Sequence, residues 1–193
     1  MNALATAAYT LEDLLTLPDS KGFELVDGDL VETNESTLSS WVGGESYRRI
    51  ANYVIDHGLG TVWPADCGLQ CFAGDPNRVR KPDTMFIDAK RYSIGQLTDG
   101  YLRVVPDLVV EVLSPNDNAE DIERKVGEYL DAGIRLVWII SSEARTIRIH
   151  RRDGSGLWLK SDGELSGEDV IPGFRCRVAD LFPVPIVTAA PGA

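Results

Sequence analysis

The sequence predicts an α+β protein with an α/β-like core, in which helices flank a mixed β-sheet and a β-hairpin precedes it. Residues 107–113, "DLVVEVL", form an apolar run that is typical of a strand covered on both faces. Apolar residues then recur at helical spacing over 117–133, and 134–141 has the composition of a second buried strand. This order of strand, helix and strand predicts parallel pairing through a right-handed crossover.

Segments on either side complete the predicted sheet. Residues 23–32, "FELVDGDLVE", predict two short strands about Asp27-Gly28, a pair that favours a type I′ turn. A helix is expected over 46–58, and the alternation of 145–151 places that strand near an edge. The other expected segments are strands at about 61–73, 84–88 and 156–160, with an irregular segment at 89–104.

Length and composition indicate one globular domain. The 193 residues suit a single core, expected over 1–182, while the Pro- and Ala-rich residues 183–193 are expected to form a flexible tail. Hydrophobic residues make up 44% and charged residues 25%, as in soluble proteins. No apolar run approaches the ~20 residues of a membrane helix, and the N-terminus lacks the features of a secretion signal. We therefore expect a cytoplasmic protein without a membrane partner.

The net charge of −11 opposes nucleic-acid binding, because a field of that sign repels phosphates. Binding to DNA would therefore need a local basic patch or metal ions. The densest basic run is "RVRK" at 78–81, followed by the arginine pairs at 48–49 and 151–152. Each of these, taken alone, is expected to be ordinary solvated surface.

Glu111 stands inside the buried strand, where an unpaired carboxylate costs several kcal/mol. Asp83 opens the neighbouring strand directly after a proline. Two carboxylates on neighbouring strands can hold a hard divalent cation, with the backbone carbonyl of Val112 as a third oxygen ligand. Lys125, in the following helix, could orient or deprotonate a water or stabilise charge on a phosphoryl group. These residues predict metal-assisted phosphodiester hydrolysis.

Simpler structural roles account for the same residues one at a time. Asp83 can be an ordinary strand start, and Lys125 can lie at the helix rim, paired with Asp121. Another interpretation of the two residues together is that Glu111 and Lys125 form a structural ion pair that needs no metal. Asp107 also follows a proline and shares a strand face with Glu111, so it is a possible accessory residue.

The spacing and order of these residues resemble the PD-(D/E)xK nuclease superfamily, since Glu111 follows Asp83 by 28 residues. Within that superfamily the chain resembles the Uma-two family of restriction-endonuclease-like proteins. The resemblance covers about residues 10–182, and its motifs come in the same order as in the family. The stretches that carry the resemblance are "FELVDGDLVE", "HGLGTVWPADCGLQC", "RKPDTMFID", "PDLVVEVLSPNDNAEDIERKVGEYLDAGIRLVWII" and "IPGFRCRVADLF".

The resemblance implies that Asp83 and Glu111 bind Mg²⁺ or Mn²⁺. The motif's lysine should stand two residues after Glu111, but this chain has Leu113 there. Lys125 is the matching position, as if the lysine had moved to the next helix. Glu24 matches a recurrent glutamate that is a possible accessory residue, although an exposed hairpin residue is an equally good reading.

Two further features bear on the implied site. The family often has a histidine at the start of the helix after the hairpin, whereas this chain has "STLSSW" at 36–41. That accessory contact is therefore in doubt. Gln70, on the strand before Asp83, is a further possible accessory residue.

The resemblance implies a metal-dependent endonuclease that cleaves DNA by attack of a metal-activated water, leaving a 5′-phosphate and a 3′-hydroxyl. It also implies a homodimer, and no nucleotide cofactor is expected. The alternative is a non-catalytic DNA-binding or protein-interaction module that retains the nuclease fold. The net charge and the missing histidine favour that alternative. The presence of Asp83, Glu111 and Lys125 together opposes it, because a non-catalytic relic has no need of a buried pair of carboxylates.

Overall fold

The computed structural model describes residues 8–33, 36–93, 95 and 99–184. Of the predicted tail, 183–193, all but the first two residues lie outside this description. The elements, in chain order, are α1 (Leu11–Thr16), the 3₁₀ helix η1 (Ser20–Gly22), β1 (Phe23–Val26), β2 (Asp29–Glu32), α2 (Thr37–Asp56), β3 (Gly60–Pro64), β4 (Thr84–Asp88), β5 (Leu108–Leu113), α3 (Ala119–Asp131), β6 (Leu136–Ser141), β7 (Thr146–Arg151), β8 (Gly156–Leu159), β9 (Glu164–Ser166), β10 (Arg175–Arg177) and the 3₁₀ helix η3 (Val178–Leu181).

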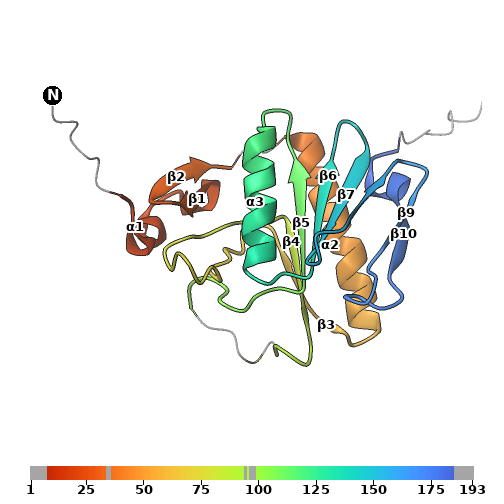
Figure 1. The fold of residues 1–193 in the computed structure, drawn as a ribbon, viewed down its shortest axis with the longest axis horizontal. Helices are drawn as coiled ribbons and strands as arrows, with labels where there is room; N and C mark the ends of the chain where they lie inside the picture. The colour runs from red at the N-terminus through yellow and green to blue at the C-terminus, as the bar shows by residue number, and fades with distance from the viewer. Residues whose placement is uncertain (1–7, 34–35, 94, 96–98, 185–193) are drawn as a thin grey trace, which may run out of the picture.

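A six-stranded mixed sheet with the order β3-β4-β5-β6-β7-β8 forms the centre of the molecule (Figure 1). β5 and β6 are parallel and the other neighbouring strands are antiparallel. The chain between β5 and β6 contains α3, so the predicted strand, helix and strand unit is confirmed. The α+β fold, with its mixed sheet, flanking helices and N-terminal hairpin, is therefore as predicted.

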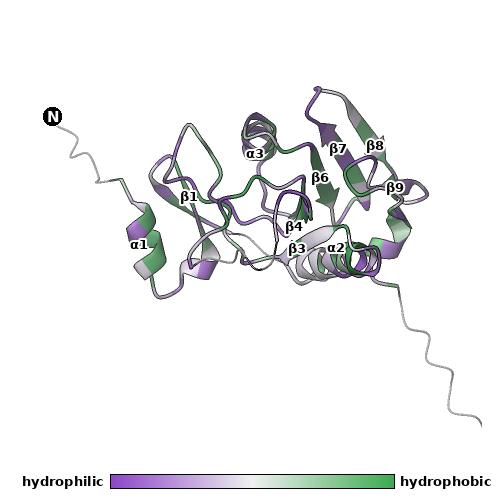
Figure 2. Cartoon of the chain, turned by 90° about the horizontal axis from the view of Figure 1, so that it is seen from below, coloured by the Kyte–Doolittle hydropathy of each residue, from purple (hydrophilic) through white to green (hydrophobic). Residues whose placement is uncertain are grey.

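The two long helices cover opposite faces of this sheet (Figure 2). Val110 of β5 packs with α2 residues in one apolar cluster, whereas Val109 packs with α3 residues in the other. Successive side chains of a strand point to opposite faces, so Glu111 points toward the same face as Val109. The fold thus directs Glu111 toward α3.

The N-terminal hairpin has the predicted turn. Asp27 and Gly28 both have positive φ, at 52° and 84°, and Val26 pairs with Asp29 across them. Those values are the type I′ signature. Leu25 also exchanges two backbone hydrogen bonds with Val79, which attaches the hairpin to the segment that precedes β4.

Two predicted boundaries are wrong. α2 begins at Thr37 rather than near residue 46, because Ser36 and Ser39 form a capping box there. Leu38 and Val42 of its first turns, four residues apart, pack in the same core as the predicted part of the helix, and the prediction missed them. The strand expected over 61–73 ends at Pro64, since proline cannot continue a ladder and Asp66 has a positive φ of 70°.

On the far side of the sheet, β7 lies next to the edge strand β8 and pairs with it across Asp153-Gly154, so its predicted place near an edge is confirmed. The β9–β10 hairpin was not predicted. Among the described residues, no helix combines the length and apolar character needed to cross a membrane.

Candidate active site

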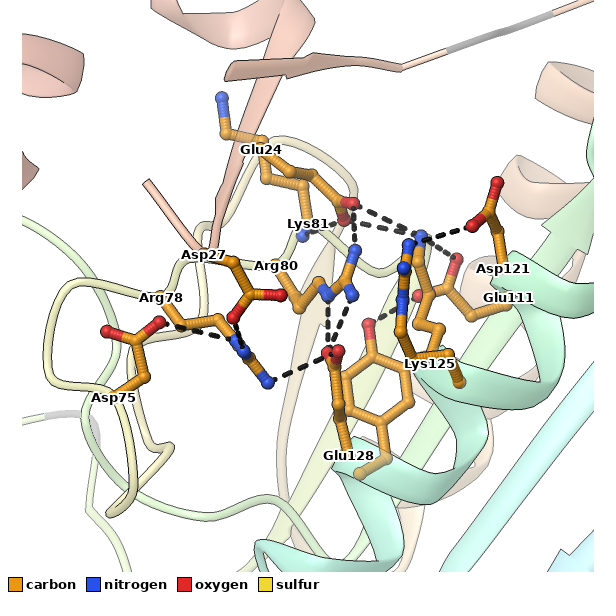
Figure 3. Close-up of polar contacts among 12 residues, drawn as sticks. Glu24, Asp27, Asp75, Arg78, Arg80, Lys81, Glu111, Asp121, Lys125 and Glu128 are labelled. Atoms are coloured by element: carbon orange, nitrogen blue, oxygen red, sulfur yellow. Dashed lines mark hydrogen bonds and ion pairs between the residues drawn. The ribbon is translucent and has the colours of Figure 1, made fainter. Parts of the chain in front are cut away.

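A cavity of 310 Å³ lies at the carboxyl end of β5. The β1–β2 hairpin, the first turn of α2, the segment before β4, and α3 also contribute to its walls. Several charged residues from these separate elements face one another across it (Figure 3). Residues that line the cavity include Glu24, Arg80, Asp83, Glu111, Val112 and Lys125.

The sheet register brings the two predicted carboxylates together. Thr84 of β4 pairs with Val110 of β5 in an antiparallel ladder. Asp83 directly precedes Thr84, so it lies at the end of this ladder, close to the part of β5 that contains Glu111 and Val112. The backbone N–H of Val112 donates a hydrogen bond of 2.7 Å to Asp83 Oδ2, which fixes this carboxylate against the end of β5.

Helix α2 approaches Asp83 at a glycine. A Cβ built on Gly43 would lie 3.1 Å from Asp83 Oδ1, so a larger residue there would press on the carboxylate. Gly43 is buried in the helix face that covers the sheet. Glycine in a helix interior costs about 0.5–1 kcal/mol relative to alanine. The close approach of α2 to Asp83 gives this glycine a reason to be there.

Glu111 is only 8% exposed and has two partners, Tyr129 and Lys125. The buried hydroxyl of Tyr129 donates a hydrogen bond of 2.5 Å to Oε1, and the Lys125 ammonium lies 3.4 Å from Oε2. Burial raises the pKa of Glu111, and the Coulomb attraction of Lys125 only partly offsets that rise. The carboxylate is therefore held in place but incompletely compensated.

The Lys125 ammonium stands between two carboxylates. Its Nζ lies 3.3 Å from Glu24 and 3.4 Å from Glu111. Burial alone would lower the pKa of Lys125, but Glu111 and then Glu24 raise it above its ordinary value. The side chain is consequently a fixed cation rather than a base. The alternative pairing with Asp121 does not form, because that carboxylate binds Arg124 at 2.8 Å.

Glu24 is a buried part of this site, not an exposed hairpin residue. It is 2% exposed and accepts hydrogen bonds from Arg80 Nη1 at 2.9 Å and from the backbone N–H of Lys81 at 2.7 Å. Burial would raise the pKa of Glu24, but Lys125, Arg80 and the Lys81 N–H together lower it below its ordinary value. Glu24 is therefore a stable anion beside Lys125.

Sequence reasoning missed Arg80. The run "RVRK" was expected to be solvated surface, but the Arg80 guanidinium is 3% exposed, so that expectation is wrong for this residue. Its Nε and Nη2 donate to Glu128 Oε2 at 2.8 and 2.6 Å. Arg78 Nη1 lies 3.2 Å from the same glutamate, and Arg78 also pairs with Asp27 at the hairpin tip (Figure 3). No periodic pattern in the sequence signals this network.

Two predicted accessory residues lie away from the cavity. The Gln70 amide donates to the carbonyl of Pro76 at 2.6 Å, and its oxygen accepts from Arg103. Asp107 stands at the other end of β5, where it accepts a hydrogen bond of 2.9 Å from the backbone N–H of Asp88. The structure therefore does not bring Gln70 or Asp107 to Asp83 and Glu111.

Serine hydroxyls occupy the helix start where the family often has a histidine. Ser36 caps α2, and Ser39 lines the cavity. The Ser39 hydroxyl lies 3.0 Å from that of Ser114, which follows β5. These contacts connect α2 to the end of β5 without a titratable group.

The donor set around Asp83 and Glu111 suits a hard cation. Both offer carboxylate oxygens, and Val112 beside them offers a backbone carbonyl. Within the described part of the chain, no three His, Cys, Asp or Glu side chains are grouped so as to hold a metal ion by themselves. Mg²⁺ does not need such a group, because it usually keeps several waters and is bound through one or two carboxylates. The residues present therefore fit a magnesium-type site.

Comparison with known proteins identifies the class. The fold is similar to that in the crystal structure of "a putative nuclease belonging to DUF820" from Anabaena variabilis ATCC 29413, with a TM-score of 0.74. That match has 18% sequence identity and covers 90% of this chain and 97% of the other. The chain belongs to the Uma2 family, described as "Putative restriction endonuclease", whose model matches residues 11–179. No curated protein matches the chain significantly.

Proposed function

We propose that the protein is a divalent-metal-dependent endonuclease that hydrolyses DNA phosphodiester bonds. One observation carries this proposal: Asp83 and Glu111 line one cavity at the end of β5, with the Lys125 ammonium 3.4 Å from Glu111. Membership of a restriction-endonuclease family and the nuclease-like fold support the same reaction class.

Each residue has a distinct role in this proposal. Asp83, Glu111 and the carbonyl of Val112 hold Mg²⁺ or Mn²⁺. The bound cation supplies a water of lowered pKa and offsets charge on the phosphoryl group. Lys125 lies 3.4 Å from Glu111, where its ammonium activates the attacking water or stabilises the negative charge of the transition state. The products are a 5′-phosphate and a 3′-hydroxyl.

The charge of the protein makes the cation important for substrate binding as well. A net charge of −11 repels DNA, and the cavity itself contains several carboxylates. Lys21, Lys81 and Arg124 also line the cavity and can contact phosphates of a bound strand. DNA binding is therefore expected to need the divalent cation and to weaken steeply with salt. A homodimer, which would suit cleavage of both strands, stays a prediction for sedimentation analysis.

Calorimetric titration of Mg²⁺ and Mn²⁺ into wild type and Asp83→Asn, with plasmid and single-stranded DNA cleavage in parallel, tests the proposal. Wild type should bind both ions and cleave DNA, and chelator should stop the cleavage. Ca²⁺ should bind but support little turnover, because its looser coordination positions water poorly. Cleavage that persists equally in chelator, or ion binding that is unchanged in Asp83→Asn, contradicts the assignment.

A second candidate function is a non-catalytic binding module. The observation that favours it is the set of ion pairs around Lys125, which gives Glu24 and Glu111 each a cationic partner without a metal. A protein of that kind would bind DNA or a protein partner equally well with and without divalent cations. DNA-binding assays in chelator separate the two candidates.

A further inference from the structure

A chain of buried ion pairs stands behind Lys125. It runs from Glu128 on α3, through Arg80 in the segment before β4, to Glu24 on β1, and ends at the Lys125 ammonium (Figure 3). The side chains of Arg80 and Glu24 are each 3% exposed and that of Glu128 is 10% exposed. Water therefore screens these pairs little. The chain links three segments that are far apart in the sequence.

Lys125 has two carboxylate partners, and they are fixed very differently. Glu24 has two other donors, the Arg80 guanidinium at 2.9 Å and the Lys81 N–H at 2.7 Å, and neither donor comes from α3. Glu111 is held by Tyr129, which lies on the same helix as Lys125. A cation bound at Glu111 would repel the nearby ammonium, since like charges repel and water screens a buried site little. Glu24 can oppose that repulsion because its position does not depend on Glu111.

We propose that Glu24, held by Arg80, is a positioning residue that keeps the Lys125 ammonium in the cavity when the charge of Glu111 is neutralised. This inference deepens the proposed nuclease function and rests on it for its purpose. Without Glu24, a cation at Glu111 would drive Lys125 out toward solvent, because a quarter of that side chain is already exposed. Arg80 and Glu128 act one step further back, by fixing the Glu24 carboxylate.

The first test uses metal-free protein, with Glu111→Gln as the mimic of a neutralised carboxylate. The measurement is the rate at which an amine-acylating reagent modifies Lys125 at fixed pH, relative to the exposed Lys90 and Lys160. Glu111→Gln alone should leave Lys125 protected. Glu24→Gln together with Glu111→Gln should raise its rate at least about tenfold, which corresponds to about 1.4 kcal/mol of lost interaction.

Glu123→Gln is the matched control. Glu123 is on the same helix, two residues before Lys125, and pairs at the surface with Arg148 at 3.4 Å. It loses the same charge without touching Lys125, so its combination with Glu111→Gln should leave Lys125 protected. The inference is overturned if Glu111→Gln by itself exposes Lys125, or if Glu24→Gln adds no more than Glu123→Gln does.

A second measurement covers the case in which Glu24→Gln does not fold. Lys125→Met keeps the length of the side chain and removes its charge. The shift that it causes in the urea unfolding midpoint is measured in wild type and in Glu111→Gln. If Glu24 is the retaining partner, Lys125→Met should shift the unfolding midpoint nearly as far in the Glu111→Gln background as in wild type. A midpoint shift that disappears in that background identifies Glu111 as the only effective partner.

Cleavage kinetics connect the inference to activity. Glu24→Gln should lower the single-turnover rate while keeping most of the Mn²⁺ affinity, and the Glu24→Gln/Lys125→Ala double variant should be no slower than Lys125→Ala. Additive losses would mean that Glu24 acts separately from Lys125. If wild type does not cleave DNA at all, the proposed function fails, while the metal-free acylation and unfolding experiments still decide whether Glu24 retains Lys125.

Discussion

The two ends of β5 each carry a buried carboxylate, but the surroundings of the two differ. Asp107, just before the strand, is 2% exposed and accepts hydrogen bonds from Arg91 at 2.7 Å and from the Asp88 N–H at 2.9 Å. Glu111, near the other end, has one short hydrogen bond from Tyr129, and its one ion pair among the described residues is with Lys125 at 3.4 Å. The Asp107 carboxylate is thus occupied by close hydrogen-bond donors, whereas Glu111 lines a cavity.

This difference shows why burial alone does not identify a functional carboxylate. Both residues satisfy the rule that a buried charge needs a partner. The partners of Asp107 come from the end of β4 and from the connection that follows it. They occupy the Asp107 carboxylate oxygens, so little capacity remains there for a ligand. Glu111 shares its cation with Glu24, and this sharing leaves part of its charge available to a metal ion.

The largest expected effect belongs to the Glu111 end. Lys125→Ala should reduce the cleavage rate by roughly 10²–10³, the usual loss for a positioned transition-state donor. Metal affinity should change much less, because a charged lysine cannot be a metal ligand. Single-turnover kinetics with parallel calorimetry measure the two effects. An unchanged rate in Lys125→Ala would refute the role.

Adding Leu113→Lys to that variant provides a rescue experiment. Leu113 lines the same cavity and stands two residues after Glu111, where the superfamily's lysine is usually found. Partial recovery of the rate would support a lysine that has moved to α3. The rescue requires that a lysine at position 113 reaches into the same cavity. Asp107 does not line this cavity, so no equivalent rescue exists at that end of β5.

Glu24→Gln should destabilise the fold by about 3 kcal/mol at neutral pH, since it leaves Arg80 and Lys125 each without one buried partner. The pKa of Glu24 is lowered in the folded state, so its contribution is present above the ordinary value of 4.5 and is lost as the pH falls through the folded-state pKa. Urea unfolding at pH 7 and at acidic pH measures this. The difference between wild type and variant should shrink on acidification; a difference independent of pH would contradict it.

At the other end of β5, Asp107→Ala should lower stability by about 2 kcal/mol, because the part-buried Asp88 N–H and the Arg91 guanidinium lose their acceptor. Cleavage per folded molecule should stay near that of wild type. Thermal unfolding and kinetics at a temperature where the variant is fully folded measure the two properties. If this variant loses cleavage while it is fully folded, the two ends of β5 are coupled. The contrast between a structural Asp107 and a functional Glu111 then does not hold.

The smallest effect is expected for Glu111→Gln in chelator. Burial raises the pKa of Glu111 above 4.5 in the folded state, so its ionisation costs stability as the pH rises through that folded-state pKa. The amide keeps an acceptor for Tyr129, and Lys125 keeps Glu24. We expect the variant to be about 1 kcal/mol more stable than wild type at neutral pH, and unable to cleave DNA.

Melting curves with chelator and with Mn²⁺ decide this prediction. Wild type should gain thermal stability on adding Mn²⁺, because the ion binds only the folded state, and Glu111→Gln should gain much less. If the variant melts well below wild type in chelator, Glu111 belongs to a structural ion pair and the metal-site interpretation is wrong.

The local pattern of the sequence determined the central unit of the fold and the core of the candidate site. The apolar runs of β5 and β6 and the stripe of α3 specify a parallel crossover, which directs Glu111 and Lys125 toward each other. Proline before Asp83 and the adjacent strand place that carboxylate at the end of β5, in the same cavity as Glu111. These features are readable because strand and helix periods fix the direction of each side chain.

Only the tertiary structure decided what surrounds that core. Arg80 meets Glu24 and Glu128, which are 56 and 48 residues away in the chain, within a segment that has no regular period. Pattern reasoning could not distinguish buried Arg80 from solvated surface, or the closed site of Asp107 from the open one of Glu111. Such contacts depend on how irregular segments pack against the sheet, and no local preference of the chain specifies that packing.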